Sequence, residues 1–73
     1  MAKRFEVGKK YYPYQREYGA VKVVRRSDYY IWCKNSSGVT FRMKIRYEIN
    51  GDEYAIDSTV PKKWRDAFTY EAR

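Results

Sequence analysis

The chain has 73 residues, of which 44% are hydrophobic and 19% aromatic, so we expect residues 1–73 to form a single small domain without room for a large buried catalytic cleft. Sixteen Lys and Arg against nine Asp and Glu give a formal charge of +7, which draws a protein of this size to polyanions at low salt. One cysteine, and no hydrophobic run as long as a signal peptide or a membrane span, lead us to expect a cytoplasmic protein with no disulfide and no membrane contact.

The first 26 residues predict two strands separated by a turn. The run KKYYPY begins a strand that Pro13 must end or confine to a sheet edge, because proline has no amide hydrogen to donate. The run YPYQREYG is typical of a turn and ends at Gly19. Residues 20–26 then predict a strand with Val21 and Val23 on one side.

The next predicted strand, residues 29–34, is rich in β-forming side chains, but its inward face depends on the loop at residues 35–38. An even loop buries Tyr30 and Trp32, and we expect this arrangement. An odd loop buries the alternate set, Tyr29, Ile31 and Cys33. We expect Cys33 to act as a small buried hydrophobic residue and not as a reactive thiol.

Residues 39–49, VTFRMKIRYEI, alternate strictly between apolar and polar side chains, which predicts a long half-buried strand. The apolar side would carry Val39, Phe41, Met43, Ile45, Tyr47 and Ile49. The polar side would carry Thr40, Arg42, Lys44, Arg46 and Glu48. Alternation requires this second side to be polar but does not require it to be basic, so its three cations are candidates for a binding surface.

Asn50-Gly51 predicts a two-residue type I′ turn, because these residues tolerate positive φ most readily. That turn would pair Ile49 with Asp52, Tyr47 with Tyr54, Ile45 with Ile56 and Lys44 with Asp57. The neighbouring Asp52 and Glu53 are expected to be solvated charges beside an exposed turn, not a general acid and base.

Near the C-terminus, Pro61 suits the start of a helical turn, PKKWR, that would bring Trp64 back to the domain. Residues 67–71 either extend this helix or form a closing strand, and the short length favours the strand. The pattern therefore predicts a mainly β fold, a small SH3-like antiparallel barrel of five or six strands with one short helical turn near the C-terminus. An OB-like barrel is the alternative, although it usually needs more residues and a longer helix.

Four segments resemble short SH3-like barrel proteins that phages, plasmids and conjugative elements of gut bacteria encode. These segments are FEVGK at 5–9 followed by Tyr11, VKVVRR at 21–26, FRMKI at 41–45 and EYA at 53–55. The resemblance spans roughly residues 5 to 57 and implies the barrel fold. Some small mobile-element proteins of this size inhibit host defence enzymes, and the resemblance assigns no functional residue.

The chain contains no histidine, so the usual acid, base and metal ligand at neutral pH is missing. A nucleophilic Cys33 or serine would lack its normal base, and no phosphate-cradling glycine loop is present. We therefore expect a protein that is not an enzyme, with no cofactor and no metal.

Basic and aromatic residues interleave along the chain, a composition in which cations follow phosphates while rings stack on unpaired bases. The candidate contacts with nucleic acid or another partner are Lys9, Lys10, Tyr11, Tyr12, Tyr14, Arg25, Arg26, Arg42, Lys44 and Arg46. The sequence favours nucleic acid as the partner. The alternative is an acidic protein surface, as in an anti-CRISPR-like or other inhibitor of a host defence complex, because four tyrosines between residues 11 and 18 cannot all fit inside so small a barrel. A structural or homodimerising barrel is a further alternative.

Overall fold

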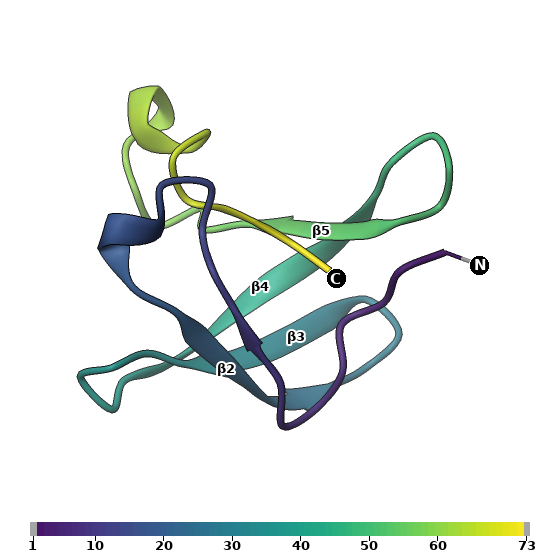
Figure 1. Ribbon diagram of the computed structural model, residues 1–73, viewed down its shortest axis with the longest axis horizontal. Helices are drawn as coiled ribbons and strands as arrows, with labels where there is room; N and C mark the ends of the chain where they lie inside the picture. Colours follow the sequence, from purple (N-terminus) through teal and green to yellow (C-terminus); the bar gives the residue numbers. More distant parts are fainter. Residues whose placement is uncertain (1, 73) are drawn as a thin grey trace.

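The computed structural model describes residues 2–72 and forms six antiparallel strands in a nearly closed barrel (Figure 1). The strands are β1 (Lys10–Tyr11), β2 (Val21–Arg26), β3 (Tyr30–Lys34), β4 (Thr40–Tyr47), β5 (Glu53–Ile56) and β6 (Thr69–Glu71). Two single 3-10 turns, η1 (Arg16–Tyr18) and η2 (Lys62–Trp64), are the only helical elements among these residues. The predicted small antiparallel barrel with a helical turn near the C-terminus is confirmed.

The strands pair in chain order, from β1 to β6. In Figure 1, β2, β3 and β4 lie side by side, and the long β4 carries the sheet over to β5. An isolated bridge joins Pro13 to Tyr70, and the Tyr14 N–H donates to the Thr69 carbonyl at 2.9 Å. The chain beyond β1 thus meets β6 and nearly closes the barrel, with Pro13 confined to its edge as predicted. No helix among residues 2–72 is long and apolar enough to cross a membrane.

One apolar cluster fills the barrel, and its members come from every strand as well as from the N-terminal segment. Its buried residues are Phe5, Tyr11, Val21, Val23, Ile31, Cys33, Met43, Ile45, Ala55, Tyr70 and Ala72. The inward direction of Val21 and Val23 is confirmed. Of the apolar positions predicted along residues 39–49, only Phe41, Met43 and Ile45 pack inward. Val39 and Ile49 lie outside β4 and are exposed, and Tyr47, its last residue, is exposed as well.

The expected orientation of β3 is wrong, because Ile31 and Cys33 face the core whereas Tyr30 and Trp32 face outward. The connection to β4 has five residues, an odd number, since Lys34 pairs with Thr40. An odd loop turns the other face of the strand inward. Cys33 is fully buried, as a small hydrophobic residue should be, and this burial raises the pKa of its thiol to about 12.

The extra residue in this loop is Val39, which the alternating pattern had placed at the start of the strand. The Asn35 side-chain oxygen accepts hydrogen bonds from the Ser37 and Val39 N–H groups, both at 3.0 Å. The Asn35 N–H in turn donates to the Val39 carbonyl at 3.0 Å. These bonds hold Val39 in the loop, so local side-chain chemistry set the loop length that apolar alternation could not show.

The predicted type I′ turn is also wrong. The Glu48 N–H donates to the Asp52 carbonyl and the Gly51 N–H to the Glu48 carbonyl, both at 2.9 Å, which leaves a three-residue connection. Gly51 has a φ of +89°, but every positive φ among residues 2–72 belongs to a glycine, so Asn50 does not adopt the left-handed conformation that a type I′ turn requires. The Asn50 side chain instead accepts the Asp52 N–H at 3.0 Å. The register is therefore shifted by one residue, and the observed pairs are Ile45 with Ala55, Arg46 with Tyr54 and Tyr47 with Glu53.

This shift brings Glu53 inward, so the expectation that it would be a solvated charge is wrong. Glu53 is 2% exposed and accepts two hydrogen bonds from the Arg26 guanidinium, at 2.9 and 3.0 Å, and one from the Phe5 N–H, at 2.8 Å. Arg26 also donates to the Phe5 carbonyl. The resulting Arg26–Glu53 clasp ties the N-terminal segment to β2 and β5.

The C-terminal prediction is confirmed in its main feature, because a short 3-10 turn is followed by the strand β6. Trp64 does not return to the barrel, since 45% of its surface remains exposed. Ala67 is buried instead, and the Phe68 ring stacks on the Tyr18 ring with centroids 4.6 Å apart.

Candidate nucleic-acid interface

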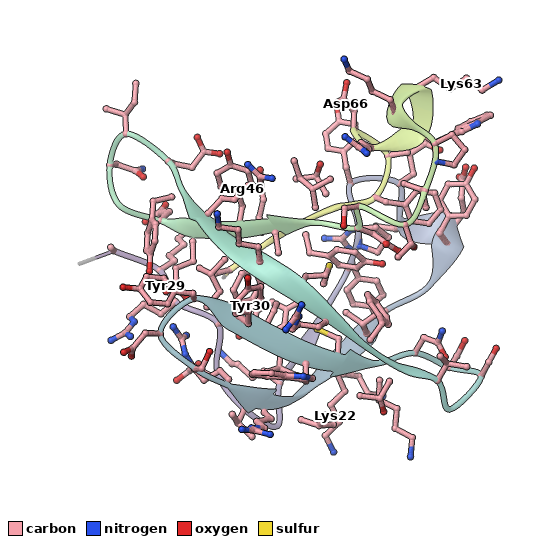
Figure 2. All side chains as sticks on the ribbon, turned by 180° about the vertical axis from the view of Figure 1, so that it is seen from behind. Lys22, Tyr29, Tyr30, Arg46, Lys63 and Asp66 are labelled. Carbon is pink, nitrogen blue, oxygen red and sulfur yellow. The ribbon has the colours of Figure 1, made fainter. Side chains whose placement is uncertain are left out.

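The outward side of β1 to β4 carries Lys and Arg side chains but no Asp or Glu, since none occurs in these four strands. We call this outward side the basic face. Its cations and rings are Lys10, Lys22, Arg25, Tyr30, Trp32, Lys34, Arg42, Lys44 and Arg46. In Figure 2, Arg46, Tyr30 and Lys22 mark this face on β4, β3 and β2. The cations that the sequence scatters over 37 positions therefore converge on one sheet surface.

A β-bulge in β2 decides which arginine belongs to this face. The register between β2 and β3 shifts between Val23 and Arg25, so Val23 opposes Cys33 and Arg25 opposes Trp32. An unbroken strand with Val23 inward would turn Arg25 inward as well. The extra residue, Val24, keeps Arg25 outward and turns Arg26 toward its partner carboxylate.

Two arginines stack on two rings in the middle of the basic face. The Arg25 guanidinium carbon lies 4.5 Å from the Trp32 ring centroid, and that of Arg42 lies 4.3 Å from the Tyr30 ring centroid. The rings of Tyr30 and Trp32 are themselves 6.4 Å apart. Each stack crosses from one strand to the next, so β3 presents a pair of rings flanked by a guanidinium from β2 and one from β4. Stacking restricts these long side chains before any ligand arrives.

At one end of the face, three lysines lie opposite one another in successive strands. Lys10 of β1 pairs with Lys22 of β2, which pairs with Lys34 of β3. We call these three residues the lysine row. Like charges directly opposite one another destabilise a sheet, so the row is not explained by the stability of the fold.

The cations of the basic face are not neutralised within the protein. The ion pairs among residues 2–72 join Arg4 and Arg26 to Glu53, and Lys9 to Glu6. None of them involves a cation of the basic face. Because both partners of the Lys9–Glu6 pair are well exposed, the pair keeps the Glu6 carboxylate occupied but contributes little to stability.

Carboxylates gather at a different part of the molecule. Glu48, Asp52 and Glu71 line a hollow of about 550 Å³ beside the β4–β5 connection, together with the buried Glu53. The charge of the protein is thus unevenly distributed, with a sheet surface free of acids and an acidic hollow near the β4–β5 hairpin. A surface of this kind attracts anions over a distance set by the salt concentration.

The sequence-predicted contacts divide into those on the basic face and those elsewhere. Lys10, Arg25, Arg42, Lys44 and Arg46 lie on it. Tyr11 instead belongs to the core, where its hydroxyl accepts the Glu6 N–H at 2.7 Å, and Arg26 is held in the Arg26–Glu53 clasp. Lys9 pairs with Glu6, and Tyr12 and Tyr14 are exposed between β1 and η1.

Four residues of the basic face were not among the predicted contacts: Lys22, Tyr30, Trp32 and Lys34. Tyr30 and Trp32 were missed because the sequence placed them inside the barrel. Lys22 follows in alternation from Val21 and Val23, which the sequence already placed on one side of the strand. Lys34 follows from the buried Cys33, so the correct loop parity would have identified it.

No group of three or more Cys, His, Asp or Glu side chains within residues 2–72 is arranged to hold a metal ion. The thiol of Cys33 lies in the core, and the buried carboxylate of Glu53 is fully engaged by Arg26 and Phe5. On the basic face the exposed groups are cations and rings, which bind anions and stack on planar groups.

Comparison of the chain with protein-family models, with curated proteins and with solved structures found no match.

Proposed function

We propose that this protein binds nucleic acid through the basic face and is not an enzyme. The observation that carries the proposal is the central row in which Arg25 stacks on Trp32 and Arg42 stacks on Tyr30, inside a surface without carboxylates. Phosphate contacts supply most of the affinity for nucleic acid, and planar guanidinium groups both bind phosphates and stack on bases.

The spacing of the cations favours a single strand as the ligand. Arg42, Lys44 and Arg46 alternate along β4, so their Cα atoms are about 6.8 Å apart. This interval is comparable to the phosphate spacing of an extended single strand, whose unpaired bases are free to stack. Tyr29 is 68% exposed next to this face and offers a further stacking ring.

A salt titration tests the proposal. We expect the Arg42→Ala/Lys44→Ala/Arg46→Ala variant to lose about three phosphate contacts, which lowers the slope of log affinity against log salt by about two units for a single strand. The matched control is Lys3→Ala/Lys62→Ala/Lys63→Ala, which removes the same charge from residues outside the basic face. Fluorescence anisotropy with a labelled oligonucleotide gives both slopes. Equal slopes for the two variants would contradict the proposal.

A protein partner is the competing function, in line with an anti-defence role. Its support is the second group of exposed rings, Tyr12, Tyr14 and Tyr18, near η1. A pull-down from the native host separates the two functions. One stoichiometric protein that stays bound after nuclease treatment and in high salt would favour the protein partner and count against nucleic acid.

A further inference from the structure

The lysine row has a higher density of positive charge than is needed to bind the phosphodiester backbone of a nucleic-acid strand. Directly opposed residues on antiparallel strands have Cβ atoms about 5 Å apart, and Lys10, Lys22 and Lys34 form two such pairs in succession. No carboxylate within residues 2–72 forms an ion pair with these three lysines. The lysines lie on neighbouring strands, which are about 4.8 Å apart, whereas the cations along β4 are about 6.8 Å apart. The row therefore carries more positive charge per unit length than β4, whose cation spacing is comparable to the spacing of singly charged phosphodiesters.

A hollow of about 390 Å³ lies at the lysine row. Its lining consists of Lys10, Lys22 and Lys34 with Ala20, Val21, Asn35 and Ser36. Figure 2 shows Lys22 extending outward from β2 at this place. The walls of the hollow are mostly apolar, and three of the residues that border it are lysines, whose ammonium groups bind phosphate oxygens.

The loop beside the hollow is well fixed. The Gly38 N–H donates to the Asn35 carbonyl at 3.0 Å, and the Asn35 side chain holds two further N–H groups of the loop. Gly38 has a φ of +83°, and a Cβ at this position would lie 4.0 Å from Lys34 Cε. The aliphatic part of Lys34 thus runs along the loop, which positions one side of the hollow.

We infer that the lysine row binds a terminal phosphomonoester of a nucleic acid whose chain follows the rest of the basic face. This inference rests on the proposed function. A phosphomonoester carries nearly two negative charges at neutral pH and three accessible oxygens, whereas a phosphodiester carries one charge. The row is the last set of outward cations at its end of the sheet, because β3 ends at Lys34 and the 35–39 loop follows. It is therefore placed to receive the end of a strand.

The pH dependence of the phosphate provides an independent signature. The second pKa of a phosphomonoester is about 6, so its second charge is lost between pH 7.5 and pH 5. The ionisable groups around the hollow are the three lysines, and the adjacent Lys9–Glu6 pair stays charged because Lys9 lowers the pKa of Glu6. The protein has no histidine. A loss of the preference for a terminal phosphate between pH 7.5 and pH 5 would therefore report protonation of the phosphate and not of the hollow's side chains.

The experiment compares three otherwise identical internally labelled oligonucleotides, with a 5′-hydroxyl and 3′-hydroxyl, with a 5′-phosphate, or with a 3′-phosphate. We expect one of the two phosphorylated oligonucleotides to bind about tenfold more tightly than the hydroxyl form at pH 7.5, and this preference to fall to about threefold or less at pH 5. The arm that gains affinity identifies which end of the strand the row receives.

The variant Lys22→Gln removes the central ammonium and also relieves two like-charge pairs, so it is expected to fold. It should lose most of the preference for a terminal phosphate while retaining binding to the hydroxyl form. The control Lys62→Gln should keep the full preference. Equal affinities for all three oligonucleotides in the unmodified protein would overturn the inference while leaving the proposed function intact. Absence of binding to every oligonucleotide would overturn both.

Discussion

The Arg26–Glu53 clasp allows the sharpest prediction about stability. Replacing Glu53 with Gln keeps the shape of the side chain and an oxygen for the Phe5 N–H, but it removes the charge that faces Arg26. The Arg26 side chain is only 19% exposed, so its guanidinium would be left largely desolvated and without its close carboxylate partner. Removing one partner of a buried ion pair costs about 3–5 kcal/mol.

Because a domain of this size has a total stability of about 4–11 kcal/mol, Glu53→Gln should remove about a third or more of it. We take about 3 kcal/mol as the expected loss, since Arg26 retains some contact with water. Urea denaturation followed by tryptophan fluorescence measures it. The control is Glu48→Gln, an exposed carboxylate on the same hairpin, which should change stability by less than about 0.5 kcal/mol. A loss below about 1 kcal/mol for Glu53→Gln would refute the reasoning.

A double-mutant cycle separates the ion pair from other effects of the substitution. Arg26→Met combined with Glu53→Gln should cost less than the sum of the single changes, with a coupling free energy of about 2 kcal/mol. Strictly additive single effects would show that the two side chains do not stabilise one another.

The same clasp predicts how stability depends on pH. Burial alone would raise the pKa of Glu53, but hydrogen bonds from Arg26 and from the Phe5 N–H outweigh it and leave the pKa below its ordinary value of 4.5. The contribution of the clasp is therefore fully present above pH 4.5 and is lost as the pH falls through the lower folded-state pKa. Glu53→Gln should be less sensitive to acid than the unmodified protein, and an equal loss of stability in both would contradict this assignment.

Three further predictions concern the sheet and its core. Lys22→Glu should stabilise the protein by about 0.5–1 kcal/mol at low salt, because it gives both neighbours in the lysine row an opposite charge, and 1 M salt should remove most of the gain in thermal unfolding. Gly51→Ala should destabilise the β4–β5 hairpin by about 1 kcal/mol in the same assay, because alanine is strained at a φ of +89°. Cys33 should react with a thiol reagent at pH 8 only after unfolding, since it is buried and its pKa is raised to about 12; rapid reaction in native conditions would contradict its place in the core.

The β-fold could be predicted from the sequence because strands are marked by local patterns of only a few neighbouring residues. Apolar and polar residues alternate around Val21 and Val23 and around Met43 and Ile45, as expected for strands that bury one face. These four side chains point into the core, as the sequence predicted. The basic polar side of β4 could be predicted for the same reason, because Arg42, Lys44 and Arg46 must point away from the buried set.

Two of the errors came from counting residues across a connection. One additional residue in the 35–39 loop reversed the face of β3, and one residue in the β4–β5 connection moved Glu53 from the surface into the barrel. Since side chains alternate with a period of two, each change of one residue inverts a whole strand. Loop length depends on hydrogen bonds such as those of Asn35 and Asn50, which hydrophobic alternation does not reveal.

The sequence by itself determined a small, basic, mainly β domain with no histidine chemistry and with an outward row of cations on one long strand, because these features follow from composition and from the two-residue period of a strand. Only the tertiary structure decided which cations are neighbours. Strand register placed Lys10, Lys22 and Lys34 opposite one another, and the bulge in β2 sent Arg25 to Trp32 and Arg26 to Glu53. Register and bulges arise from contacts between segments distant in sequence, so the binding surface exists only in the folded protein.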